Sequence, residues 1–349
     1  SGLTFQGGDD FITYSFLNSG QLRMDDCIIH PADSGVVTGA ILNSGVATLK
    51  NVTITGGASS GTANGIENVE GGSLILRDSL VSAPVSNQGT GTGIRNEGEL
   101  SLENTLVEAT YTGSNGTGIL HQSGTISVSG GLIGAANSGG ASAAVVVLSG
   151  EAIFVGTILH GGSGANGATA LEIEGGAKGT VLQSILRTGT TAVSNGVVLS
   201  DGELVLVNSI VETSEGSGVA VDCTTGSESL TMKHNLLYGG DQVFVAGDFS
   251  VEDVGVVTVE GVNSCAFGCC TDVSGNLLGA PLYAEEGDED VSTWDFHLSE
   301  NSPAIGAGTD LAPWFTPGGI FFTDGVVDMD GETHPGGDGL WDIGLDSVQ

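Results

Sequence analysis

A motif that returns about every 26 residues limits this chain to folds built from stacked, similar units. The motif is Gly-x-apolar-x-apolar-x-Asn/Asp, followed by one small and two apolar residues, as in Gly20-Gln-Leu-Arg-Met-Asp-Asp26-Cys-Ile-Ile. Similar copies begin at Gly45, Gly72, Gly98, Gly124, Gly150, Gly176 and Gly202, and a degenerate copy begins at Glu228. A fixed period in this range is the sequence signature of a repeat architecture.

A second motif lies between these copies and adds another apolar column. It reads Gly-Ala-Ile41-Leu-Asn43, then Gly-Ile66-Glu-Asn68, Gly-Ile94-Arg-Asn96 and Gly-Ile119-Leu-His121. Later members of the same column are expected at Val145, Leu171, Val197 and Val219.

The spacing of the apolar residues identifies the fold class. They alternate within each copy, which is the period of a strand and not of a helix. One unit cannot bury its apolar side alone, so it must stack on its neighbours. A β-propeller blade needs about 40–50 residues, and the Leu-x-x-Leu-x-Leu spacing of leucine-rich repeats is missing. The repeat predicts an all-β fold, a right-handed single-stranded parallel β-helix over residues 1–262. Asn and Asp side chains should form ladders in its turns, and glycines should supply positive φ angles.

Charge excludes several classes of function. The chain has 349 residues with 7 Lys and Arg against 42 Asp and Glu, a formal net charge of −35. Nucleic-acid binding needs a cationic face, and polyanionic sugars would be repelled unless Ca²⁺ bridged them. No apolar run reaches the roughly 20 residues of a membrane span. Ser1 begins directly in sequence typical of the repeat, so we expect a signal peptide, if there was one, to be absent from this chain.

The last quarter of the chain differs from the rest. The repeat weakens after residue 240, and all three tryptophans, Trp294, Trp314 and Trp341, follow residue 263. Residues 263–349 are therefore predicted to form an irregular C-terminal region that packs on the open end of the stack.

This tail also resembles a known family. It contains Ser302-Pro-Ala-Ile-Gly-Ala-Gly308, Asp328-Met-Asp-Gly-Glu-Thr-His-Pro335 and Trp341-Asp-Ile-Gly344. These segments are similar to the tails of bacterial secreted right-handed β-helix proteins of the pectate-lyase-like superfamily, which carry Ser-Pro-Ala-Ile-Asp-Ala-Gly and Asp-x-Asp-Gly motifs. Gly306 departs from the usual Asp and His334 from the usual Arg. The resemblance implies the fold and export, so we expect a secreted or cell-surface bacterial protein. It does not imply an activity.

No residue cluster in the sequence identifies a catalytic centre. Lyases of the family that the tail resembles hold Ca²⁺ beside an Arg or Lys base, and no Arg or Lys of this chain has acids at ligand spacing nearby. A glycosidase needs two carboxylates at a defined separation. Asp78, Asn104 and Asn208 share one column, which favours a structural ladder. We therefore predict no catalytic residue.

A calcium site is the best candidate for metal binding. Asp324, Asp328, Asp330 and Glu332 place carboxylates at near-alternate positions, and hard oxygen ligands suit Ca²⁺. The EF-hand spacing is not met. The alternative is an acidic loop whose Asp side chains bond to turn backbone.

Five cysteines allow a small disulfide framework. Cys265, Cys269 and Cys270 are close enough in sequence to close a short loop, and Cys223 is a further candidate partner. The alternative is inert thiols, and no spacing supports a strong zinc site. Because Cys27 makes the count odd, one thiol is left free or pairs with another chain.

The N-terminus enters directly as strands and predicts an assembly edge. An unpaired edge invites another chain, and a like subunit docking there head to tail would give a filament. Alternatively, residues 1–10 cover this edge themselves, or a longer precursor supplied a cap. The edge residues are Leu3, Phe5, Phe11, Ile12, Tyr14 and Phe16.

These observations favour a non-catalytic surface or matrix protein, either adhesin-like or a subunit of a head-to-tail filament. Its expected partners are like subunits or extracellular glycans, with calcium as the only expected cofactor. The alternatives are a secreted polysaccharide-degrading enzyme, either a glycosidase or a lyase, and a carbohydrate-binding module.

Overall fold

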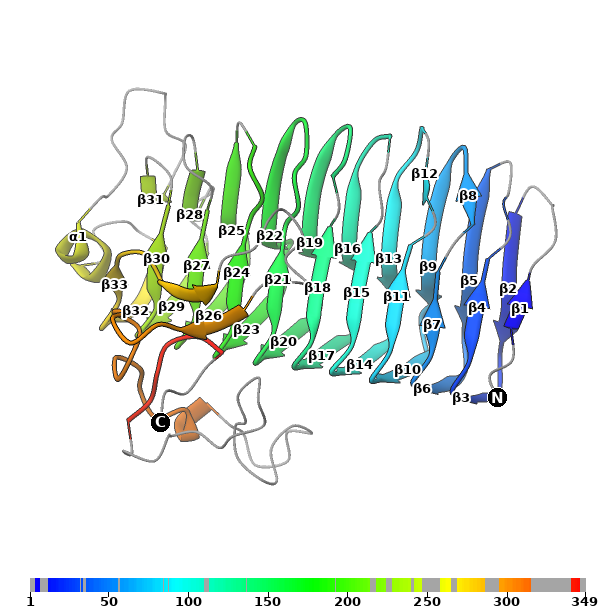
Figure 1. Cartoon of the computed structure of the whole chain (residues 1–349), viewed down its shortest axis with the longest axis horizontal. Helices are drawn as coiled ribbons and strands as arrows, with labels where there is room; N and C mark the ends of the chain where they lie inside the picture. Colours follow the sequence, from blue (N-terminus) through cyan, green and yellow to red (C-terminus); the bar gives the residue numbers. More distant parts are fainter. Residues whose placement is uncertain are drawn as a thin grey trace.

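The computed structural model of the chain is a solenoid whose strands run parallel from one coil to the next (Figure 1). Each coil gives one strand to each of three sheets, which we name B, C and A in their order along the chain. In sheet C, Ser73 pairs with Glu99 and Glu99 pairs with Thr125, so a coil takes 26 residues. The predicted all-β parallel β-helix is therefore confirmed. The structure describes residues 4–6, 12–31, 33, 36–55, 57–83, 85–86, 88–109, 113–135, 137–191, 193–213, 218–223, 228–239, 242–246, 258–264, 269–285, 295–314 and 340–345.

Sheets B and C have ten strands each. Sheet B contains β2 (Ile12–Asn18), β5 (Val37–Asn43), β9 (Thr62–Asn68), β13 (Gly91–Asn96), β16 (Gly116–His121), β19 (Ala141–Val147), β22 (Gly167–Glu174), β25 (Ser194–Ser200), β28 (Gly218–Cys223) and β31 (Gln242–Ala246). Sheet C contains β3 (Gln21–Asp25), β6 (Val46–Lys50), β10 (Ser73–Arg77), β14 (Glu99–Glu103), β17 (Thr125–Ser129), β20 (Glu151–Val155), β23 (Lys178–Leu182), β26 (Glu203–Val207), β29 (Ser229–Lys233) and β32 (Cys270–Ser274).

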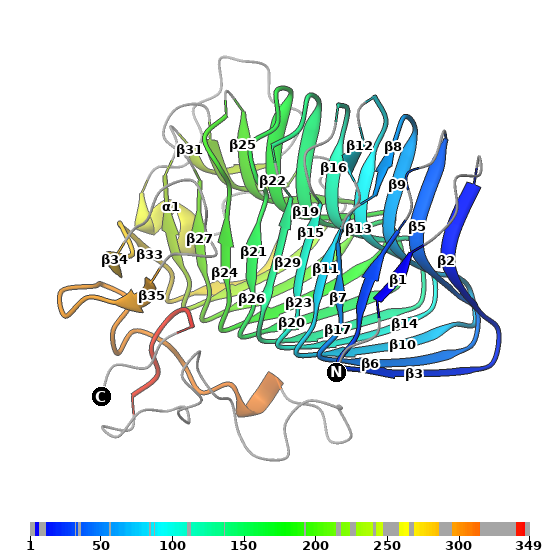
Figure 2. The same cartoon turned by 45° about the vertical axis from the view of Figure 1, so that its right-hand side comes forward.

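Sheet A has eleven shorter strands and completes each coil (Figure 2). It contains β1 (Thr4–Gln6), β4 (Ile28–His30), β7 (Thr53–Ile54), β11 (Leu80–Ser82), β15 (Leu106–Ala109), β18 (Leu132–Ala135), β21 (Ile158–His160), β24 (Ile185–Arg187), β27 (Ile210–Glu212), β30 (Leu236–Tyr238) and β33 (Leu277–Leu278). Two strands in the loops before sheet B, β8 (Ala58–Ser59) and β12 (Val85–Ser86), pair with each other.

The second sequence motif forms the inward column of sheet B. Its side chains from Ile41 to Val197 are fully buried in the main core cluster. Val219 was expected to continue this column, and that prediction is wrong. The register pairs Val219 with Asn195 and places Val221 beside Val197. The column consists of the residue that follows the small residue in each strand, and in β28 this small residue is Ala220, so the column continues at Val221.

Small residues form the column next to this one and let sheet B approach sheet A closely. A Cβ on Gly93 would lie 2.6 Å from the Val107 side chain, and one on Gly196 would lie 2.2 Å from that of Val211. The column contains Ala40, Gly65, Gly93, Gly118, Ala144, Ala170, Gly196 and Ala220.

The turn between sheets C and A uses one residue per coil in the left-handed conformation. Asn51, Asp78 and Asn104 have φ angles of 52°, 48° and 46°. Asn and Asp enter this region more readily than other residues with a Cβ. Glycine was expected at such turns, and it takes the position only in some coils, as at Gly130 with φ of 66°.

An asparagine ladder runs along the opposite corner, where sheet B turns into sheet C. The Asn43 amide donates to Asn68 and the Asn68 amide donates to Asn96, each over 2.7 Å. Asn96 then donates to Nδ1 of His121 over 2.9 Å, so this nitrogen must carry no proton. Burial lowers the pKa of His121 to about 4, which keeps the ring neutral. The expected turn ladder therefore lies on asparagines that end the strands of sheet B.

The described part of the tail lies along the side of the stack (Figure 1). Strands β34 (Tyr283–Glu285) and β35 (Asp295–Leu298) pair antiparallel. Phe296 and Ile343 pack on Ile185, Ile210 and Leu236, which point outward from sheet A. Leu311, just before a 3-10 helix at Ala312–Trp314, packs on three outward residues of sheet C, Val155, Leu182 and Val207.

The described residues of the predicted region 263–349 thus contact the side of the stack, where the last coils carry outward apolar residues that need cover. At the end of the stack lies a short helix, α1 (Val259–Ser264), which adds Val262 to the main core. Parallel pairing continues to Leu278. No helix among the described residues is long and apolar enough to cross a membrane.

Candidate functional site

The outward face of sheet B carries several partly buried ionisable side chains. Each follows a residue of the inward column, as Glu67 follows Ile66 and Glu172 follows Leu171. The parallel register stacks these outward residues in one column, at about 4.8 Å per coil. From β5 to β28 the column is Leu42, Glu67, Arg95, Leu120, Val146, Glu172, Val198 and Asp222.

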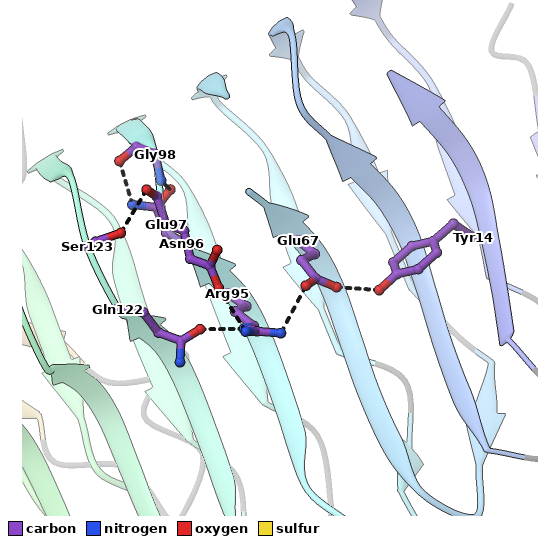
Figure 3. A network of polar contacts seen from close by, with 8 residues as sticks. All are labelled: Tyr14, Glu67, Arg95, Asn96, Glu97, Gly98, Gln122 and Ser123. Atoms are coloured by element: carbon purple, nitrogen blue, oxygen red, sulfur yellow. Dashed lines mark hydrogen bonds and ion pairs between the residues drawn. The ribbon is translucent and has the colours of Figure 1, made fainter. Parts of the chain in front are cut away.

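At the N-terminal half of this column, a polar network joins four strands or their ends (Figure 3). The Tyr14 hydroxyl donates to one oxygen of the Glu67 carboxylate, and Nη1 of Arg95 bonds the other over 2.9 Å. The guanidinium also reaches Glu97 over 2.8 Å and Gln122 over 2.6 Å. The bonds to Glu67 and Gln122 join neighbouring coils, and the bond to Glu97 lies within the coil of Arg95.

Burial and the bond to Glu67 raise the pKa of Tyr14, so its hydroxyl stays protonated and acts as the donor. The Glu67 and Arg95 side chains are only 15% and 35% exposed. Charged pairs in such positions fix geometry more than they add stability. The network therefore presents a preorganised polar surface.

We expect Arg95→Met to lower the free energy of unfolding by about 1–2 kcal/mol, because it leaves the half-buried Glu67 without its cation. Urea unfolding followed by circular dichroism measures the change. Arg23→Met is the matched control, since the Arg23–Asp25 pair lies on the surface, and it should leave the urea midpoint unchanged. Equal midpoints for the two variants would show that the network does not hold the coils.

The C-terminal half of the column is acidic. Burial, followed by a hydrogen bond to Glu174, raises the pKa of Glu172 to about 7. Burial, followed by the charge of Glu228, raises the pKa of Asp222 to about 6. Near neutral pH, Glu172 is thus partly protonated while Asp222 is mostly ionised. Two carboxyl groups on one face with separated pKa values can act as an acid and a base.

The register places these two carboxyl groups two strands apart, with Val198 between them. Two steps along a parallel sheet amount to about 9.6 Å between backbones. Inverting glycosidases separate their carboxyl groups by about 6.5–9.5 Å, and retaining ones by about 5–5.5 Å. This backbone spacing is close to the upper limit of the inverting range and well above the retaining one.

Most cations of the chain are engaged in ion pairs. Besides Arg23 and Arg95, four more of the seven Lys and Arg side chains contact a carboxylate on the adjacent coil. The closest pair is Lys233–Asp272 at 2.6 Å. A lyase needs an Arg or Lys base that is free to take a proton, so these pairs weigh against that alternative.

The predicted site residues are distributed as follows. The predicted calcium ligands Asp324, Asp328, Asp330 and Glu332 lie outside the described residues. Within the described ranges, no group of three or more His, Cys, Asp or Glu could hold a metal.

Among the cysteines, Cys270 is disulfide-bonded, while Cys223, Cys269 and Cys27 are free thiols. Cys265 lies outside the described residues.

The predicted assembly edge contains the first described strands of sheets A and B, and each of these strands pairs only with the next coil. Strand β1, which contains Phe5, pairs with β4, and β2, which contains Ile12, pairs with β5. Phe16 packs against the core, and Tyr14 belongs to the network described above. Leu3 and Phe11 lie outside the described residues.

The sequence interpretation missed Glu67, Arg95, Glu172 and Asp222 as a group. The available signal was their shared position directly after the inward apolar column, which is visible in Gly-Ile66-Glu-Asn68 and Gly-Ile94-Arg-Asn96. No family model, curated protein or solved structure matches the chain.

Proposed function

We propose that the chain is a non-catalytic extracellular surface or matrix protein, a rigid rod that presents the outward face of sheet B to a glycan. The observation that carries this proposal is the Tyr14–Glu67–Arg95 network, which holds polar groups from three strands of sheet B in fixed positions on its outward face. A preorganised surface loses little entropy on binding. The net charge of −35 favours neutral or amino sugars over polyanionic ones.

Affinity electrophoresis of the full chain in gels containing neutral, amino-sugar or acidic polysaccharides tests this proposal. Retardation by a neutral or amino-sugar polymer is expected, without release of new reducing ends. Arg95→Met should weaken it, while Arg77→Met, which removes a surface ion pair on sheet C, should not. Unaltered migration in every gel, or equal retardation of both variants, would count against a glycan-binding face on sheet B.

Self-assembly is the second form of this proposal. Among the described strands, β2 and β3 each pair on one side only, with β5 and β6. Such edges can accept a strand from a like chain. Size-exclusion chromatography with negative-stain microscopy should show linear particles at some Ca²⁺ or salt concentration. Discrete monomers under all conditions would reject assembly without affecting the glycan proposal.

An inverting glycosidase is the second candidate function, favoured by the positions and pKa values of Glu172 and Asp222. Glu172 would donate a proton to the leaving oxygen, and Asp222 would activate water. If the chain cleaves a polysaccharide, the rate should peak between about pH 6 and 7, where the acid is protonated and the base ionised.

We expect Glu172→Gln and Asp222→Asn each to reduce cleavage by about 10³-fold or more if these side chains are the acid and the base. Glu203→Gln is the matched control, because Glu203 lies on sheet C, away from the proposed site, where it pairs with Lys178. Reducing-end assays on a panel of neutral and amino-sugar polysaccharides measure the rate. A panel without any product, or full activity in both variants, would reject the candidate.

A further inference from the structure

Two buried thiols near the C-terminal end of the stack are in direct contact. Cys223 ends β28 in sheet B, and Cys269 directly precedes β32 in sheet C. Both are free, with exposed fractions of 0% and 2%. The side chains are hydrogen-bonded to each other within the main core cluster.

The backbone on both sides of this contact is held in place. Cys223 pairs with Leu199 in sheet B, and the Cys269 carbonyl accepts a hydrogen bond of 2.9 Å from the Leu230 amide. A disulfide forms only where two cysteines already lie close together. These thiols meet that condition although 45 residues separate them in the sequence.

The two thiols differ in reactivity. The bond from Cys269, together with burial, raises the pKa of Cys223. The same bond lowers the pKa of Cys269. Cys269 is therefore the thiol that ionises first, and the thiolate is the nucleophile in disulfide exchange.

We propose that Cys223 and Cys269 form a second disulfide when a local opening of this end of the stack lets an oxidising low-molecular-weight disulfide, such as oxidised glutathione, reach Cys269. The Cys269 thiolate attacks one glutathione sulfur, which breaks the glutathione disulfide and releases one glutathione thiolate. Cys223 then loses its proton to a released thiolate and attacks the Cys269 sulfur, displacing the second glutathione. The protein loses two thiol hydrogens and gains one S–S bond, while oxidised glutathione is reduced to two thiols.

The cross-link would tie the coil that contains β28 to β32, the last described strand of sheet C. It is distinct from the disulfide of Cys270, which already exists in the structure. Closing a long loop restricts the unfolded chain, so the oxidised form should resist heat better than the dithiol form.

Tryptic mapping of the native full chain, oxidised with glutathione and then alkylated in denaturant, tests the proposal. Trypsin cleaves after Lys233, the last Lys or Arg, so Cys223 and Cys269 fall in different peptides. We expect the peptide 188–233 to be joined to the peptide 234–349, and the Tm to rise by about 5 °C. Cys27→Ser, which removes a buried thiol from another coil, should keep both effects. Cys269→Ser and Cys223→Ala should each lose both.

Two separate peptides from oxidised wild type would overturn the proposal without recourse to any variant. A joined pair that persists in Cys269→Ser would also overturn it, because Cys223 would then be bonded to another cysteine.

Discussion

Replacement of Gly118 by valine is expected to lower the free energy of unfolding by about 4 kcal/mol. A Cβ at this position would lie 2.6 Å from the carbonyl oxygen of Ala144 and 2.8 Å from that of Gly134. It would also lie 2.8 Å from a methyl carbon of Ile133. The two oxygens belong to the backbone of neighbouring strands, which cannot move aside without breaking the sheets. The urea midpoint from circular dichroism measures the loss.

Gly20→Val is the matched control for this experiment. Gly20 occupies a turn of the first described coil, and no heavy atom lies within 4 Å of a Cβ built there. The control should change stability by no more than about 0.5 kcal/mol. If both variants unfold at the same urea concentration as the wild type, the close contact between sheets A and B is not present at this coil.

Acidification from pH 6.5 to 4 is expected to remove about 3 kcal/mol of stability through His121 alone. Its pKa falls from 6.5 to about 4 on folding, so the unfolded chain binds more protons in this window. The contribution is therefore fully present above pH 6.5 and is lost as the pH falls through 4. Protonation also removes the acceptor that Asn96 uses. Urea midpoints measured at several pH values give the slope.

Two variants separate the proton from the hydrogen bond. His121→Asn continues the ladder with an acceptor, so it should match the wild type at pH 7 and lose the extra slope below pH 6.5. His121→Val introduces the residue type that follows in the same column at Val147. It should also lose the slope, but it should cost about 1 kcal/mol at pH 7, because the Asn96 amide loses its partner. A wild-type slope in both variants would exclude His121 as the source.

The fold could be predicted from sequence because the alternation of apolar residues within each coil shows which side chains are buried. In the copy that begins at Gly72, for example, the alternating residues Leu74 and Leu76 are fully buried in β10. A period that repeats in this way leaves one way to bury all units together, which is to stack them.

The outward face could not be predicted in the same way, because its contacts depend on the register between coils. Glu67 meets Arg95 across 28 residues, and loops of differing length decide that spacing. The pKa of Glu172 depends on burial by neighbouring parts of the chain. The inward column requires only that a residue be apolar, whereas these pairs require a particular neighbour.

The sequence of the repeat contains a signal that predicts where the tail packs, and our sequence interpretation did not use it. In one outward column of sheet C, Lys50, Arg77 and Glu103 occupy early coils, and Val155, Leu182 and Val207 occupy later ones. The change from charged to apolar residues at one register position marks the coils on which the tail packs.

The same change makes the coils unequal as building blocks. Duplication or deletion of a whole unit between residues 45 and 123 would leave the surface on which the tail packs unchanged. This half can therefore vary in length during evolution. The coils from about residue 150 onward instead carry the outward apolar residues on which tail side chains such as Leu311 and Phe296 pack. Insertion of a unit there would shift the match by one coil, so natural variants of different length should differ upstream.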